Sequence, residues 1–166
     1  MLPAYVPNSA AAAVGGGIPV DFGRNWRDGK RVLGDGKTIR GFCGGVACGC
    51  IIGLLQIMAQ GYPAFSALPQ MSILPVFLLA TGALAGDMVK SFFKRRAGIE
   101  RGGSWPFVDQ YDFVAGAFLF LFIGDPAFAF SVLTLPVIIT ILIITPVLHR
   151  VVNIIGYKMG VKDVPW

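Results

Sequence analysis

Long apolar stretches separated by short polar connections dominate the chain. Five stretches, 2–20, 39–58, 68–89, 113–124 and 128–152, approach or exceed the roughly 20 residues that a helix needs to cross a bilayer. The fourth reaches about this length when it is counted as 108–127. The first is the weakest, but no basic residue precedes it, so it does not resemble a cleaved signal peptide. The pattern predicts an all-α integral membrane protein with five transmembrane helices.

Composition supports a membrane protein over a soluble one. Hydrophobic residues make up 55% of the chain and charged residues only 14%, with a mean hydropathy of +0.69. Soluble domains carry roughly 25% charged residues. Because no domain boundary, tandem repeat or disordered tail interrupts the sequence, we expect residues 1–166 to form a single polytopic domain.

Charge is concentrated in two blocks, 21–41 and 86–112, which hold eleven of the fourteen Lys and Arg residues and seven of the nine Asp and Glu residues. The other cations, Arg150, Lys158 and Lys162, end or follow the fifth stretch. With five helices, all of these cations fall on one side of the membrane, which the positive-inside rule makes cytoplasmic. We therefore expect the N-terminus outside and the C-terminus in the cytoplasm. This topology also accounts for the net charge of +5, so no nucleic-acid partner is expected.

Small residues indicate close helix packing. Gly41, Gly45, Gly49 and Gly53 recur every four residues along the second stretch, a spacing that lets a neighbouring backbone approach closely. At Gly41, where the stripe begins, the alternative is that the missing side chain admits a ligand. The three cysteines of the same stretch lack the spacing of a zinc site and are expected to be packing residues.

The second charged block contains the best candidates for chemistry. Four polar side chains share one face of a helix that continues the third stretch: Asp87, Lys90, Ser91 and Lys94. Asp109 and Asp112 stand three residues apart where the fourth stretch begins. Carboxylates on one face can hold Mg²⁺, which takes phosphate oxygens as further ligands. The alternatives are an ion pair at a wet helix end and acids favoured by the helix dipole.

The first charged block contains a glycine-rich segment, 34–38, beside a predicted helix start. A phosphate-binding P-loop would require glycine at position 31, where Arg31 stands, so that motif is excluded. Lys37 still supplies positive charge, and Thr38 is placed to cap a helix beginning near Ile39, where a phosphate could bind. A solvated cytoplasmic loop is the alternative. His149, near the cytoplasmic end of the fifth stretch, is expected at the membrane interface.

These segments resemble a known family. Residues 19–23, 28–31, 34–38 and Gly41 resemble the first cytoplasmic loop of CDP-archaeol synthases, and 86–95 with 109–112 resemble the second. The resemblance extends over the whole chain, including Asn8. It implies transfer of a cytidylyl group from CTP to the phosphate of 2,3-bis-O-geranylgeranylglycerol 1-phosphate in the membrane. The expected products are CDP-archaeol and pyrophosphate, and the expected cofactor is Mg²⁺.

The related CDP-diacylglycerol synthases share part of the pattern. Five residues fit their signature: Ser91, Lys94, Arg95, Asp109 and Asp112. However, Glu100 and Arg101 stand where Lys-Asp is expected, no histidine precedes Gly102, and Gln110 replaces an arginine. These departures favour the archaeal ether lipid over a diacyl phosphatidate.

The resemblance also implies roles for individual residues. The expected Mg²⁺ ligands are Asp87, Asp109 and Asp112. The expected catalytic residues are Asp87, Lys90, Ser91, Lys94 and Lys37. The expected substrate-binding residues are Asn8, Asp21, Asp35, Thr38, Gly41 and Arg95.

Two other functions were considered. A CDP-alcohol phosphotransferase is excluded, because Val32 and Leu33 stand where its motif requires Ala-Arg. A non-enzymatic lipid transporter or scaffold would explain the apolar helices and the glycines but not the acids and lysines on one side.

Overall fold

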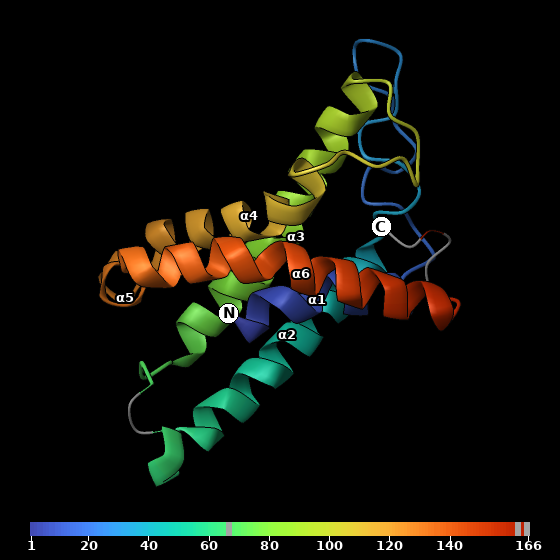
Figure 1. Ribbon diagram of the computed structural model, residues 1–166. Helices are drawn as coiled ribbons and strands as arrows, with labels where there is room; N and C mark the ends of the chain where they lie inside the picture. Colours follow the sequence, from blue (N-terminus) through green and yellow to red (C-terminus); the bar gives the residue numbers. More distant parts are fainter. Residues whose placement is uncertain (66–67, 162–163, 165–166) are drawn as a thin grey trace.

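The computed structural model describes residues 1–65, 68–161 and 164. The cation at position 162 lies outside them. The described part is helical and contains no β-strand, only two isolated bridges in the first loop, between Pro19 and Thr38 and between Asn25 and Arg31. The helices are α1 (Leu2–Val14), α2 (Ile39–Ala59), η1 (Pro63–Phe65), α3 (Ile73–Arg96), α4 (Val108–Gly124), α5 (Pro126–Val132) and α6 (Leu135–Lys158) (Figure 1). The predicted all-α fold is confirmed for these residues.

Three helices, α2, α3 and α6, are long and apolar enough to cross a membrane. The first predicted span is shorter than expected, because α1 ends at Val14 and has 13 residues. Gly16 and Gly17 follow in left-handed conformations, at φ +95° and +79°, which end the helix. At 17 residues, α4 is also shorter than a full span.

The predicted fifth span, 128–152, is divided in two. Its first part belongs to α5, which ends at Val132, and α6 begins at Leu135. Pro136 explains the new start, because proline has no backbone N–H and its fixed φ suits the first turn of a helix. Asp125 caps α5 by accepting a hydrogen bond from the Phe128 N–H at 3.0 Å. A run of apolar residues therefore does not form one continuous helix.

Glycines bring the helix backbones together, as predicted. All four glycines of the α2 stripe are buried. A Cβ atom built on Gly45 would lie 2.7 Å from the Pro7 carbonyl oxygen of α1, and one on Gly49 would lie 2.8 Å from the Pro3 carbonyl oxygen. On α3, a Cβ at Gly82 would lie 2.6 Å from the Gly116 oxygen of α4. These crossings leave no room for a side chain.

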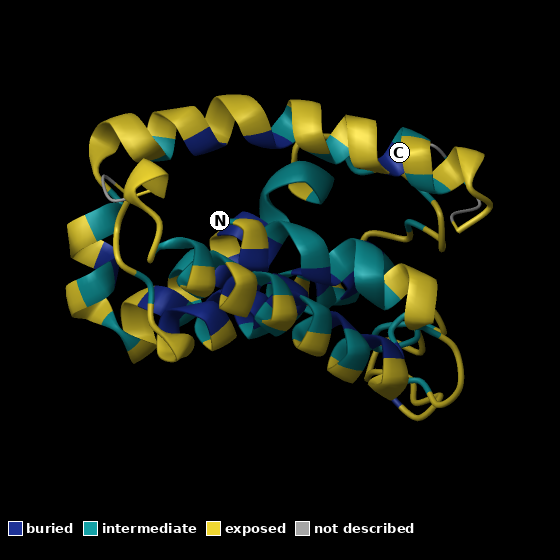
Figure 2. Cartoon of the chain, turned by 90° about the horizontal axis from the view of Figure 1, so that it is seen from below, coloured by how far each residue is buried: buried dark blue, intermediate teal, exposed yellow. Residues whose placement is uncertain are grey.

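The core lies where α1, α3 and α4 meet, and Figure 2 shows it surrounded by exposed helix faces. Its members are small or aliphatic residues and one aromatic residue, including Ala4, Leu79, Ala83, Phe113 and Ala117. Large apolar side chains cover the outside, and Ile123, Phe130 and Ile143 are 74%, 75% and 68% exposed. An apolar exterior of this kind suits a lipid environment rather than water.

The two charged loops lie side by side at one end of α3 (Figure 1). The Lys30 Nζ donates to the Arg96 carbonyl at 2.9 Å, and Arg96 Nε lies 2.8 Å from Asp28 Oδ2. The Arg96 guanidinium also lies over the Phe92 ring, 4.4 Å from its centroid. The first loop is therefore held against the end of the helix that carries the second charged block.

Candidate active site

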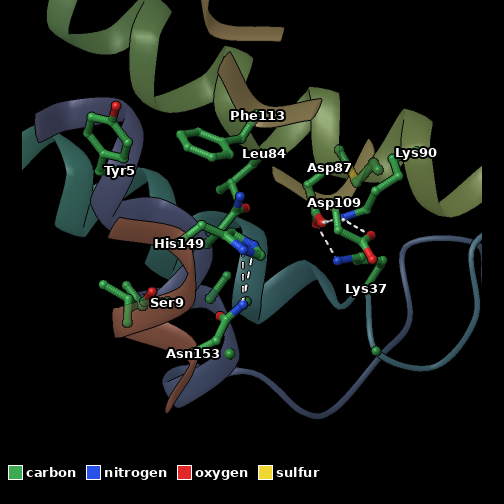
Figure 3. A pocket seen from close by; sticks show the side chains of 18 of the residues that line it. Tyr5, Ser9, Lys37, Leu84, Asp87, Lys90, Asp109, Phe113, His149 and Asn153 are labelled. Carbon is green, nitrogen blue, oxygen red and sulfur yellow. Dashed lines mark hydrogen bonds and ion pairs between the residues drawn. The ribbon is translucent and has the colours of Figure 1, made fainter. Parts of the chain in front are cut away.

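A cavity of about 590 Å³ opens between α1, α3, α4 and α6 at their charged end. One part of its wall is charged and comes from α3, α4 and the first loop. The other part is a mixture of apolar side chains and polar side chains outside the charged group, and it comes from α1 and α6. Several residues predicted from the sequence line it: Asn8, Lys37, Thr38, Gly41, Asp87, Lys90, Lys94 and Asp109. Figure 3 shows the charged group and the α1–α6 wall facing the same space.

Lys90 lies among three carboxylates. Its Nζ is 2.8 Å from Asp112 Oδ2 and 3.0 Å from Asp87 Oδ1. It also lies 3.3 Å from Asp109 Oδ1. The Lys90 side chain is only 13% exposed, and a buried charge is stable only when opposite charges surround it. The predicted shared face of α3 therefore points at the start of α4.

Two further lysines complete the charged cluster, which we define as Lys37, Lys90, Lys94, Asp87, Asp109 and Asp112. Lys37, from the first loop, forms an ion pair with Asp87. Lys94 Nζ donates to Asp109 Oδ1 at 2.9 Å and to the Gly103 carbonyl at 2.6 Å. Three ammonium groups and three carboxylates come together, so the cluster is close to neutral at pH 7.

The three carboxylates do not form a ready metal cage. Among the described residues, no three carboxylate, thiol or imidazole groups are arranged to hold a metal ion, and the Lys90 ammonium lies between the aspartates instead. Mg²⁺, however, usually takes one or two carboxylates and completes its shell with water and phosphate oxygens. Asp112 Oδ1 is buried and has no hydrogen-bond partner in the described part of the chain. These hard oxygen donors fit an ion that binds together with a phosphate ligand.

The hydroxyl groups of Ser91 and Thr38 form hydrogen bonds with backbone groups of nearby residues in the chain. The Ser91 hydroxyl lies on the predicted face but donates to the Asp87 carbonyl of its own helix at 2.8 Å. Thr38 caps α2 as predicted, since its Oγ1 accepts from the Gly41 N–H at 3.0 Å. Gly41 is packed closely as well, because a Cβ there would lie 3.0 Å from the Ala11 carbonyl oxygen. Arg95 is half-buried and does not line the cavity.

Asp21 organises the first loop, away from the cavity. Its carboxylate accepts from Arg31 Nη2 at 2.9 Å and from the Leu33 and Gly34 N–H groups, each at 2.9 Å. Burial raises the pKa of this carboxyl, but the Arg31 guanidinium and the backbone donors outweigh burial and hold the pKa well below its usual range. Asp35 is 67% exposed and pairs with Arg31 at 2.7 Å. The structure therefore does not bring these two predicted substrate contacts to the cavity.

The sequence reasoning missed part of the cavity wall. His149 and Asn153 of α6 line the cavity together with Ser9 of α1, and the Asn153 Nδ2 lies 3.2 Å from His149 Nδ1 (Figure 3). The available signal was their spacing of four residues, which places both on one helix face. His149 also lines the cavity, which the prediction of a place at the membrane interface did not include.

Apolar helices that enclose a cavity with buried lysines and aspartates define a membrane-embedded protein with a polar functional site. A solved structure with similar architecture is described as an intramembrane enzyme for archaeal membrane lipid biosynthesis. It is 42% identical, with a TM-score of 0.65, and the alignment covers 79% of this chain and 81% of that one. This similarity places the chain among multi-pass membrane enzymes.

The particular family follows from the sequence relatives. The CarS-like CDP-archaeol synthase family matches residues 1–166. CDP-archaeol synthases of Methanosphaerula palustris and Methanoculleus marisnigri are 61% and 60% identical, with all of each chain covered. The CDP-archaeol synthase of Methanosarcina barkeri is 49% identical, also over the full length. The chain belongs to the CDP-archaeol synthase family, and the resemblance seen in its motifs is confirmed.

Proposed function

We propose that the chain transfers CMP from CTP to the phosphate of 2,3-bis-O-geranylgeranylglycerol 1-phosphate, giving CDP-archaeol and pyrophosphate. Beside the family membership, the observation that carries this proposal is the charged cluster, which lies in a cavity walled by apolar helices. The lysines can bind phosphates that enter from the aqueous side, while the apolar helices can contact isoprenoid tails that enter from the bilayer. A transporter or scaffold would need no such cluster.

The reaction requires little covalent chemistry from the protein. An oxygen of the lipid phosphate attacks the α-phosphorus of CTP, and a new P–O–P linkage forms. The bond from the α-phosphorus to the oxygen bridging to the β-phosphate breaks, and pyrophosphate leaves with that electron pair. The lipid phosphate is largely ionised near pH 7, because its second pKa is about 6, so no general base is needed. Catalysis then consists of positioning and charge neutralisation.

The charged cluster supplies that neutralisation. Lys37, Lys90 and Lys94 would exchange carboxylate partners for triphosphate oxygens when CTP binds. Asp87, Asp109 and Asp112 would hold Mg²⁺, which when bound adds positive charge beside the phosphates. Thr38 lines the cavity near Lys37 and could donate its hydroxyl. Ser91 would act through the backbone of Asp87 rather than by direct contact.

The topology that supports this chemistry has five crossings, with the N-terminus outside and the C-terminus in the cytoplasm. In this arrangement α1 and α4, although short, cross beside α2, α3 and α6. Both charged loops then face the cytoplasm, where CTP is available, as the distribution of cations favours. The ether lipid is preferred to a diacyl phosphatidate because the chain belongs to the CDP-archaeol synthases and departs from the diacyl signature at Glu100 and Gln110. A diacyl substrate is the second candidate.

Replacing Asp109 with Asn tests this assignment. Asp109 contacts both Lys90 and Lys94 and lines the cavity. We expect Asp109→Asn to fold but to lose CMP transfer by a factor of roughly 100 or more, measured as radiolabel passing from α-labelled CTP into extractable lipid. Glu100→Gln, which changes an exposed acid of the loop before α4, should keep activity within about two-fold. Full activity of Asp109→Asn would remove this residue from the site.

A further inference from the structure

A polar strip runs along α6 where it faces α1. Thr145, His149 and Asn153 are spaced four residues apart, so they lie on one face of the helix. His149 and Asn153 line the cavity together with Asn8 and Ser9 of α1 (Figure 3). Asn153 is only 3% exposed. None of these side chains belongs to the charged cluster, although all except Thr145 line the same cavity.

Hydrogen bonding fixes α6 against α1 at the start of the strip. The Thr145 hydroxyl donates to the Ile141 carbonyl of its own helix at 2.6 Å. Its single proton is therefore used, and the Tyr5 hydroxyl, 2.7 Å away, must be the donor between the two side chains. This contact holds the next turns of α6, with His149 and Asn153, against the cavity.

The two parts of the cavity differ in the groups they offer to a ligand. In the proposed function, the lysines of the charged cluster are already assigned to the nucleotide phosphates. The reaction, however, brings two phosphates together. Apart from Thr38, the remaining polar side chains of the same cavity lie on the α1–α6 wall. They can donate through the His149 ring N–H and the amides of Asn153 and Asn8.

The chemistry of the wall matches a lipid headgroup. Apart from a phosphate proton, an ether lipid phosphate carries only acceptors, namely phosphate and ether oxygens. Asn8 Oδ1 is buried and has no hydrogen-bond partner among the residues that the structure describes, so its amide can turn and present the NH₂ group to such acceptors. Apolar residues flank the strip on α6, including Leu148 and Val152. The charged part of the cavity, by contrast, is bordered by loop residues Gly36, Gly102 and Gly103.

We propose that His149, Asn153 and Asn8 form the subsite that binds the phosphate and neighbouring glycerol oxygens of the lipid substrate, separate from the nucleotide phosphates. This inference rests on the proposed function and assigns the α1–α6 wall to one of its two substrates. The isoprenoid tails would leave this subsite along α1 and α6, while CTP would occupy the charged part.

His149→Leu tests the subsite. Loss of a hydrogen bond to a charged phosphate should raise the KM for the lipid phosphate by roughly ten- to a hundred-fold, while the KM for CTP stays within about two-fold. His149→Gln keeps a side-chain donor and should recover part of the loss. Thr140→Val is the matched control, because Thr140 is an exposed residue of α6 whose hydroxyl donates to the Pro136 carbonyl. It should behave like the wild type.

A binding measurement separates this inference from the proposed function. The thermal stabilisation of the detergent-solubilised protein by the ether lipid phosphate is compared with that by the same diether glycerol without phosphate. The phosphate should stabilise the wild type and Thr140→Val more than His149→Leu. An unchanged response of His149→Leu would overturn the subsite, and a matching rise in the KM for CTP would assign the strip to the nucleotide. A wild type that binds the lipid phosphate but never forms CDP-lipid would defeat the proposed function alone.

Discussion

At the scale of single residues, a carboxylate can belong to a loop rather than to the chemistry. Asp21 has a side chain that is 1% exposed, and five donor contacts surround it. A carboxylate whose acceptor positions are filled by Arg31 and backbone N–H groups has little capacity left for a metal or a substrate. Its contribution is to hold the first loop, which carries Lys37, in a defined conformation.

Asp21→Asn should therefore destabilise the fold in a pH-dependent way. The folded pKa of Asp21 lies below the unfolded value of about 4, so the ionised carboxylate stabilises the fold above that value. This stabilisation is lost as the pH falls through the folded pKa. At pH 7 we expect Asp21→Asn to reduce the free energy of unfolding by about 1–3 kcal/mol. The difference in melting temperature from wild type should narrow between about pH 5 and pH 3, and a difference independent of pH would contradict this role.

Residue-level periodicity predicted the charged part of the site but not the rest. The spacing of Asp87, Lys90 and Lys94 was sufficient to predict that they share one face of a helix, because residues three and four positions apart are neighbours on any helix. Their pairing with Asp109 and Asp112 depends on how α3 packs against α4, which local sequence does not encode. His149 and Asn153 were missed because the α1 residues that line the cavity with them are about 140 residues away in the chain.

At the scale of elements, helix contacts are set by small residues more than by apolar content. The four-residue glycine period on α2 predicted the close approach of a neighbouring helix, and Gly45 and Gly49 indeed meet the backbone of α1. The apolar run 128–152, in contrast, gave no sign of the break before α6, since hydropathy averages over residues and does not register a single proline. The start of a helix was thus predictable where a capping residue marks it, as Thr38 does for α2. Helix bounds were not predictable where hydropathy was the only guide.

Gly45→Ala should separate α1 from α2. The new Cβ would meet the Pro7 carbonyl oxygen at 2.7 Å, and a backbone atom cannot turn aside as a side chain can. We expect Gly45→Ala to reduce the free energy of unfolding by about 1–3 kcal/mol and to lower the melting temperature in detergent. Gly61→Ala is the control, because its nearest contact, the Met58 oxygen, would lie at an ordinary 3.5 Å. Equal melting temperatures for the two variants would argue against close packing at Gly45.

At the scale of the whole molecule, both charged loops lie at one end of the helices, and the account requires that end to face the cytoplasm. Sequence and structure agree on the common end, while the side of the membrane comes from the distribution of cations alone. The two short helices, α1 and α4, leave the number of crossings as a prediction.

Single-cysteine labelling tests this topology. In a variant with Cys43, Cys48 and Cys50 replaced by Ala, a cysteine is introduced at Asn25 in the first loop or at Gly61 in the loop after α2. In intact cells, a membrane-impermeant maleimide should label Gly61→Cys at once. Asn25→Cys should react only after the cells are permeabilised. Labelling of Asn25→Cys from outside would show the opposite orientation, in which the charged loops face away from the cytoplasm and its CTP.

The central claim is that this chain joins CMP to a lipid phosphate. The most direct measurement is pyrophosphate release by purified protein given CTP, Mg²⁺ and the geranylgeranyl ether lipid phosphate, beside a parallel reaction with the diacyl lipid phosphate. We predict release that requires both CTP and the ether lipid and that matches the CDP-lipid formed in a ratio of about one to one. Folded protein that releases pyrophosphate with neither lipid would contradict the account.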